Sequence, residues 1–166
     1  MDVNIRIAGE AGQGLLTTGN LLVGAFSSMG LHAFATKSYM SRVRGGLNWF
    51  DVRIADHELF GAREQADLLV ALSDSAVEVL AQALADGALV LFDGEEAPAS
   101  APDDTLAIDL TAAAKDAGGT PVMANTVASG VVFALLGYDA ETLCEYVKKQ
   151  FQRMGEDIAE QNAACV

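Results

Sequence analysis

Val3-Asn4-Ile5-Arg6-Ile7-Ala8-Gly9-Glu10-Ala11-Gly12-Gln13-Gly14 is the stretch that sets the fold expected of this chain. Apolar and polar residues alternate over positions 3–8, which predicts a strand, and the glycines after it predict a turn. From residue 15 to residue 29 apolar side chains recur at helical spacing, and Gly30 supplies a stop. A strand is therefore expected to lead through a glycine turn directly into a helix.

The rest of the chain alternates between short apolar runs and helical patterns. Strands are predicted at residues 31–36, 47–54, 67–72, 88–92 and 105–108. Helices are predicted at 75–85, 110–117, 124–136, 140–151 and 156–164, and an acidic loop with two prolines at 95–104. This alternation predicts an α/β fold, a doubly wound, mostly parallel Rossmann-like sheet with helices on both faces. We expect one domain over residues 1–166, in which 152–166 form a C-terminal helix or begin a linker to a further domain.

Composition narrows the classes of partner. The chain has 166 residues and a formal net charge of −13, with six basic and six acidic side chains up to residue 64 and four and seventeen beyond it. Binding to nucleic acid needs a broad basic face, so it is not expected. The apolar runs are shorter than the roughly 18–20 residues of a membrane span, and no signal peptide is evident. The composition predicts a cytoplasmic protein that could bind a small anion near its N-terminal half.

The glycine turn is the first candidate site. Gly9, Gly12 and Gly14 permit positive φ and let backbone amides approach a ligand, at the positive end of the following helix. Gln13 could add its side-chain amide. The spacing differs from the G-x-G-x-x-G of dinucleotide binders, and no acidic residue ends the second strand, so NAD is disfavoured. The alternative is a tight turn that serves packing alone.

The second candidate site is the basic stretch Lys37-Ser38-Tyr39-Met40-Ser41-Arg42-Val43-Arg44-Gly45-Gly46. Three of the chain's ten Lys and Arg residues stand here beside paired glycines, which favours contact with an anionic ligand or a neighbouring subunit. The alternatives are a solvated turn and pairing with the acidic C-terminal half. The tyrosine could stack on an adenine or pack at an edge, and Asn125 could contact a ligand or cap its helix.

The candidate ligand-binding residues are Gly9, Gly12, Gln13, Gly14, Lys37, Ser38, Tyr39, Arg42, Arg44, Gly45, Gly46 and Asn125. We expect no catalytic residue, because neither His32 nor His57 stands in an arrangement typical of a nucleophile and its base. We expect no metal ligands either. Cys144 and Cys165 are distant from one another in sequence and have no companion ligands.

Several of these segments together resemble the gamma domain of 2-oxoacid:ferredoxin oxidoreductases. The similarity rests on the Gly9–Gly14 turn opening a helix, Ser38-Tyr39, Arg44-Gly45-Gly46 before a strand ending in Arg53-Ile54, the strand Asp67–Leu72, Asn125 with Gly130 and Gly137, and Gly155-Glu156-Asp157. It covers essentially the whole chain. The glycine turn and the Arg-Gly-Gly loop at this separation form a specific pair, whereas either alone would be weak.

The resemblance implies a reaction that this chain does not complete alone. In the family a 2-oxoacid is decarboxylated on thiamine diphosphate, electrons pass through iron–sulfur clusters to ferredoxin, and the acyl group passes to coenzyme A. Thiamine diphosphate, Mg²⁺ and the clusters are expected in alpha, beta and ferredoxin-like partner subunits or domains. Contacts to coenzyme A as a co-substrate, and subunit packing, are expected of this domain.

Two other functions stay open at this point. One is a free-standing Rossmann-like enzyme that binds a nucleotide, and the other is a purely structural partner whose basic loop docks on another subunit. The sequence of residues 38–46 resembles that of family members in which this domain begins a longer alpha subunit, so the chain could be a truncated piece of such a subunit. The isolated chain could also form a homodimer.

Overall fold

The structure is a computed structural model that describes residues 1–10, 12–39 and 46–166. Its central feature is a six-stranded sheet with strand order β2-β3-β1-β4-β5-β6. The strands are β1 (Asp2–Gly9), β2 (His32–Tyr39), β3 (Asn48–Ala55), β4 (Ala66–Ala71), β5 (Leu84–Asp93) and β6 (Leu106–Ile108). The helices are α1 (Leu15–Ser28), α2 (Asp74–Leu80), α3 (Leu110–Asp116), α4 (Ala124–Leu135), α5 (Ala140–Phe151) and α6 (Glu156–Ala164). Short 3-10 turns η1 (Ala81–Ala83), η2 (Pro121–Met123) and η3 (Gln152–Met154) stand between them.

The sheet is mostly parallel, as predicted. β1 pairs in parallel with β4, β4 with β5, and β5 with β6. β3 runs the other way and pairs antiparallel with both β1 and β2. The reversal follows from chain length, because β2 ends at Tyr39 and β3 begins at Asn48, too close for the dozen or more residues of a parallel crossover. β2 and β3 therefore form a hairpin at one edge of the sheet.

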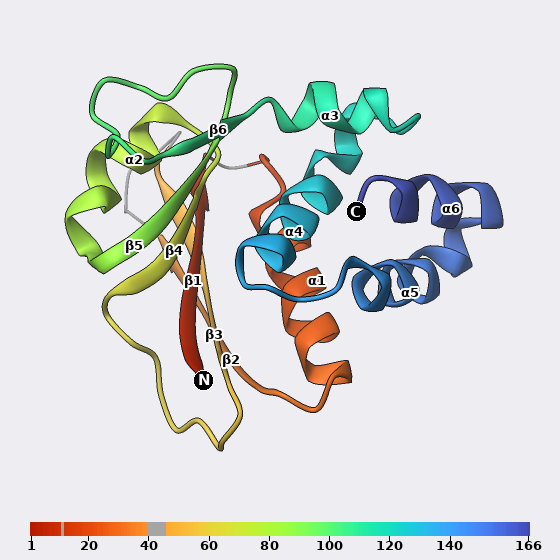
Figure 1. The fold of residues 1–166 in the computed structure, drawn as a ribbon, viewed down its shortest axis with the longest axis horizontal. Helices are drawn as coiled ribbons and strands as arrows, with labels where there is room; N and C mark the ends of the chain where they lie inside the picture. Colours follow the sequence, from red (N-terminus) through yellow and green to blue (C-terminus); the bar gives the residue numbers. More distant parts are fainter. Residues whose placement is uncertain (11, 40–45) are drawn as a thin grey trace.

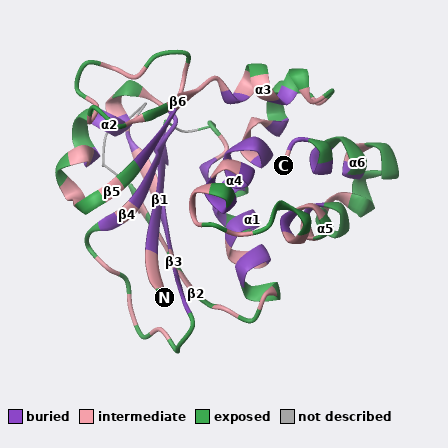
Figure 2. Ribbon diagram, in the orientation of Figure 1, coloured by how far each residue is buried: buried purple, intermediate pink, exposed green. Residues whose placement is uncertain are grey.

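Helices cover the two faces of the sheet unequally (Figure 1). α1 packs directly on β1, β2 and β3, α4 packs on α1, and α5 and α6 form an outer layer. The core on this face is apolar, and the rings of Phe26 and Phe133 stack in it with centroids 4.5 Å apart. Figure 2 shows the buried residues along the central strands and the inward sides of α1 and α4. On the opposite face α2 packs Ala76, Val77 and Leu80 against β4 and β5.

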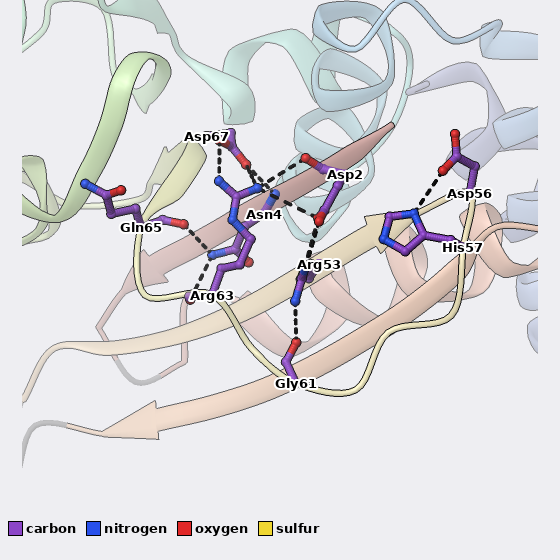
Figure 3. Close-up of polar contacts among 9 residues, drawn as sticks. All are labelled: Asp2, Asn4, Arg53, Asp56, His57, Gly61, Arg63, Gln65 and Asp67. Carbon is purple, nitrogen blue, oxygen red and sulfur yellow. Dashed lines mark hydrogen bonds and ion pairs between the residues drawn. The ribbon is translucent and has the colours of Figure 1, made fainter.

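The same opposite face carries charges over β1 and β3. Arg6 and Asp51 form an ion pair, with Nε 2.7 Å from Oδ1, and both are buried. The connection between β3 and β4, residues 56–65, runs across these strands. Its backbone carbonyls accept hydrogen bonds from side chains of β1 and β3. Figure 3 shows part of this network, in which Arg53 donates to the Gly61 carbonyl at 2.8 Å.

Most predicted elements are confirmed to within one or two residues, but three are not: the helix predicted at 75–85 and the strands predicted at 88–92 and 31–36. The helix predicted at 75–85 is wrong in its last part, because α2 ends at Leu80 and β5 begins at Leu84, where it pairs with Ala66 of β4. The strand predicted at 31–36 extends to Tyr39, because residues 37–39 pair with β3. Lys37, Ser38 and Tyr39 thus belong to a strand and not to the loop.

No single helix in the described parts of the chain is long and apolar enough to cross a membrane; residues 110–116 and 121–135 reach that threshold only together, across a bend of 117°.

Candidate functional site

The carboxyl ends of β1 and β4 form the point where the fold changes direction. From β1 the chain passes into α1 on one face, and from β4 it passes into α2 on the other. In open α/β sheets, ligands bind in the crevice at such a switch point. A cleft of about 390 Å³ lies there, which we call the switch-point cleft. The glycine turn, the end of β5, the start of α3 and the start of α4 line it.

The glycine turn adopts the backbone conformation expected of it. Gly12 and Gly14 have φ of 97° and 80°, the left-handed region that side chains disfavour. Gly14 is the N-cap of α1, with no side-chain cap there and no acidic residue in the first turn. A Cβ on Gly14 would also lie 2.2 Å from Oδ1 of Asn125. The start of α1 is therefore held close to α4, with its positive end uncompensated by a side chain of its own first turn.

Gln13 shapes this turn. Its Oε1 accepts a hydrogen bond from the Glu10 amide at 2.6 Å, and its Nε2 donates to the Leu72 carbonyl at 2.8 Å. The side chain thus joins the loop after β1 to the end of β4. Both ends of the amide thus help to position the turn, and a contact between Gln13 and a ligand stays a prediction.

Asn125 lies beside the turn, but it does not cap its helix. α4 begins at Ala124 after the turn η2, so Asn125 falls inside the first turn of the helix and the capping alternative is wrong. Its Nδ2 donates to the Val122 carbonyl at 3.2 Å, and its Oδ1 accepts from the Thr18 hydroxyl at 3.3 Å. Asn125 therefore joins α4 to α1 at the wall of the switch-point cleft.

A second, smaller cleft of about 220 Å³ lies on the other side of Gly12, between α1 and the β2–β3 hairpin. We call it the hairpin-side cleft. Lys37 and Tyr39 line it, with Leu16 of α1 and Phe50 of β3. The Lys37 ammonium lies 5.8 Å from the centre of the Phe50 ring, and Tyr39 is 68% exposed. The structure thus brings both residues to the glycine turn.

The other residues of the basic stretch have different outcomes. Side chains alternate along a strand, so Ser38 faces away from Lys37 and Tyr39, toward the α2 side of the sheet. Gly46 is half-buried just before β3. Arg42, Arg44 and Gly45 lie outside the described residues, and their role stays a prediction. Of the basic stretch, the structure therefore places Lys37 and Tyr39 beside the glycine turn, whereas most of the Arg-Gly-Gly loop falls outside the described residues.

Asp93 is the site residue that sequence reasoning missed. It ends β5, lines the switch-point cleft and accepts a hydrogen bond from the Leu110 amide at 3.0 Å. Burial raises the pKa of this carboxyl, and Asp109 nearby adds to the effect. A signal was present, because an acidic residue directly after the apolar run 88–92 stands at the carboxyl end of a parallel strand.

Groups for metal binding or nucleophilic catalysis are not assembled in the described parts of the chain. No three His, Cys, Asp or Glu side chains gather there in an arrangement that could hold a metal ion. Burial raises the pKa of the Cys144 and Cys165 thiols, which favours the unreactive protonated form. His57 lies beside Asp56, on the connection that leaves β3. What the site offers is binding, through amides, a lysine, a carboxylate and apolar walls.

These features define an α/β domain of the Rossmann type with two clefts beside its glycine turn. Residues 4–166 match the family described as pyruvate ferredoxin/flavodoxin oxidoreductase, and the chain belongs to this family. It is 31% identical to the 2-oxoglutarate synthase subunit KorC of Archaeoglobus fulgidus, covering 95% of this chain and 83% of that one. It is 33% identical to the ketoisovalerate oxidoreductase subunit VorA of Methanothermobacter thermautotrophicus, covering 90% of this chain but only 32% of that one.

Solved structures agree with the family. The keto/oxoacid ferredoxin oxidoreductase gamma subunit from Geobacter sulfurreducens superposes with a TM-score of 0.78 at 30% identity, covering 98% of this chain and 93% of that one. The 2-oxoglutarate:ferredoxin oxidoreductase from Magnetococcus marinus, with 2-oxoglutarate, coenzyme A and succinyl-CoA bound, gives 0.84 at 25% identity over 99% of this chain and 29% of that one. The gamma-domain resemblance read from the sequence is confirmed.

Proposed function

We propose that this chain supplies coenzyme A contacts and subunit packing to a 2-oxoacid:ferredoxin oxidoreductase that converts a 2-oxoacid to an acyl-CoA. The observation that carries the proposal is the meeting of the glycine turn, Lys37 and Tyr39 around Gly12. The relative from Magnetococcus marinus, which has the same fold, has coenzyme A bound. The site is thus a binding site in a larger enzyme.

The chemistry of coenzyme A fits the groups around the turn. Its phosphates suit the lysine ammonium and the uncapped amide end of α1, because anions are favoured near a helix N-terminus. The exposed ring of Tyr39 offers a face on which an adenine can stack. Lys37 and Tyr39 lie on one face of β2, two residues apart, so they present charge and ring side by side.

The reacting groups belong to partner subunits in this proposal. An iron–sulfur cluster needs four cysteine thiolates, or two with two histidines, and no three His, Cys, Asp or Glu side chains gather in the described parts of the chain. Both thiols are engaged within the fold, Cys144 with the Ala163 carbonyl and Cys165 with the Ala114 carbonyl. The chain therefore does not fit a cluster. Thiamine diphosphate, Mg²⁺ and the clusters are assigned to alpha, beta and ferredoxin-like partners, with ferredoxin as the electron acceptor and the cytoplasm as the location.

The test is acyl-CoA formation by the complex assembled from this chain and its partner subunits. Lys37→Ala should raise the KM for coenzyme A about fivefold to tenfold with little change in kcat, as expected for loss of one charge-assisted contact. Lys149→Ala, an exposed lysine on α5, is the matched control. The same assay tests the sequence-based prediction for Arg42 and Arg44.

Two outcomes would contradict the proposal. Turnover by the isolated chain would make it a free-standing enzyme. An unchanged KM for coenzyme A in the Lys37→Ala complex would leave the domain as a structural partner only.

A further inference from the structure

Asp93 is a charged group that the proposed function does not use. It projects into the switch-point cleft from the end of β5, and its Oδ1 is engaged by the Leu110 amide. The residue is half-buried, and burial raises the pKa of its carboxyl. Among the described residues that line this cleft there is no lysine or arginine. The carboxylate therefore sets the sign of the charge inside the cleft.

A carboxylate in a partly closed cleft selects against phosphate groups. Like charges repel more strongly where water is partly excluded, so a diphosphate placed beside Asp93 would be unfavourable. The carboxylate instead accepts hydrogen bonds from N–H and O–H donors. Thr111 and Asn125 add neutral polar groups, and Leu72, Leu110 and Pro121 add apolar surface. A chain of amides, hydroxyls and methylene groups suits these walls.

The hairpin-side cleft has the opposite character. Its charged residue is Lys37, and Tyr39, Leu16 and Phe50 make its walls largely apolar and aromatic. A cation with aromatic rings suits phosphates and an adenine. Gly12 lines both clefts, so a ligand lying across the turn meets a cationic side and an anionic side.

We infer that the two clefts divide coenzyme A between them. The adenosine phosphates lie on the hairpin side, and the uncharged pantetheine arm, with its amides and hydroxyl, enters the switch-point cleft, where Asp93 accepts a hydrogen bond from it. Asp93 is then a specificity-determining residue that holds the arm and keeps phosphate out. This inference rests on the proposed function and deepens it.

The experiment uses the assembled complex with two half-ligands. Pantetheine serves as a truncated acyl acceptor, and the adenosine bisphosphate half of coenzyme A serves as a competitive inhibitor. Asp93→Asn keeps an oxygen for the Leu110 amide and removes the charge, so the fold is preserved. Asp93→Ala removes the contact altogether. Asp116→Asn, at the exposed end of α3, is the matched control.

We expect Asp93→Ala to raise the KM for coenzyme A and for pantetheine about tenfold, and Asp93→Asn about threefold to fivefold, since hydrogen bonds to charged groups are the strong ones. The inhibition constant of the adenosine bisphosphate should stay unchanged or fall. Lys37→Ala should give the reverse pattern, with weaker inhibition and an unchanged KM for pantetheine.

Two results would overturn the inference alone. Weaker adenosine bisphosphate inhibition in the Asp93 variants, with pantetheine unaffected, would reverse the assignment of the two clefts. Wild-type values in both Asp93 variants would remove Asp93 from the site, while a response to Lys37→Ala would leave the proposed function standing. If the two Asp93 variants and Lys37→Ala all keep the wild-type KM for coenzyme A, the inference and the proposed function are both wrong.

Discussion

The two faces of strands β1 and β3 are buried through different interactions. On the α1 face, Ile5, Ile7 and Val52 are fully buried in an apolar core. On the other face the alternate residues of the same strands include Arg6 and Asp51, which are 5% and 6% exposed and pair with each other. Helices cover the first face. The second is covered in part by a connection without regular secondary structure, residues 56–65.

The charged face binds this connection through side-chain donors and backbone acceptors. Arg6 donates to the Glu64 carbonyl at 3.0 Å, and Arg53 donates to the Gly61 carbonyl at 2.8 Å. Asn4 donates to the Gln65 carbonyl at 2.9 Å. An apolar core tolerates replacement of one side chain by another of similar shape. A buried ion pair tolerates substitution only when both partners are replaced together. The two faces should therefore respond differently to mutation.

Breaking the buried ion pair should have the largest effect. Asp51→Ala leaves the Arg6 guanidinium buried without its partner, which should lower the free energy of unfolding by about 3–5 kcal/mol in urea titrations. The double replacement Arg6→Met with Asp51→Leu should restore most of this loss. Equal destabilisation by the single and double changes would show that the pair itself is not the reason.

Overfilling the apolar face should have a moderate effect. A Cβ on Gly19 of α1 would lie 2.1 Å from the Phe50 ring, so Gly19→Ala forces repacking that destabilises by about 1–3 kcal/mol. Helix propensity alone would stabilise by about 1 kcal/mol, so the sign of the change in urea unfolding decides which effect wins. We expect net destabilisation, relieved when Phe50→Leu is added. A more stable Gly19→Ala protein would contradict this packing.

Releasing the connection at one point should have a smaller effect. Arg53→Met removes the bonds to Asp2 and to the Gly61 carbonyl, both partly exposed, and should destabilise the protein only slightly. The more specific readout is faster proteolytic cleavage within residues 56–65. Arg153→Met, an exposed arginine near the end of α5, is the control and should leave cleavage unchanged.

The smallest expected effect concerns the Arg53–Asp2 ion pair and its contribution to stability at low pH. A hydrogen bond from Arg53 holds the pKa of Asp2 below its ordinary value of 3.8, so the carboxylate stabilises the folded state above that pH. This contribution is lost as the pH falls below 3.8 toward the lowered pKa. Asp2→Asn should therefore flatten the loss of stability below pH 3.8, measured by urea unfolding. An unchanged slope would show that Asp2 contributes nothing to acid unfolding.

Local pattern predicted much of this fold. The alternation over residues 3–8 and the glycines after it placed β1, the turn and α1. The pattern could not predict the reversed direction of β3, because side chains alternate in the same way in parallel and antiparallel strands. It also missed the first residues of β5, where pairing of Leu84 with Ala66 overrides a sequence that reads as helix.

The site was predicted less completely, because its roles depend on residues distant in sequence. Gln13 reaches the Leu72 carbonyl and Asn125 reaches Thr18, and neither partner can be read from the local sequence. Lys37 and Tyr39 reached the glycine turn because a hairpin extends β2 beyond the residues that pattern alone assigned to it. Asp93 could be identified as a site residue only from the strand order, because the parallel pairing of β5 with β4 places the end of β5 at the cleft.

Hydrogen–deuterium exchange on the assembled complex, with and without coenzyme A, examines the proposed site without any mutation. The amides at the start of α1, residues 12–16, have no side-chain cap; the Gln13 amide donates to the Glu10 carbonyl at 3.3 Å, and the others should exchange slowly only when phosphates bind them. We predict coenzyme A-dependent protection there and at residues 37–39, with little change in residues 56–65 on the charged face. Saturating coenzyme A that supports turnover but leaves residues 12–16 unprotected would contradict the assignment of this domain as a coenzyme A-binding one.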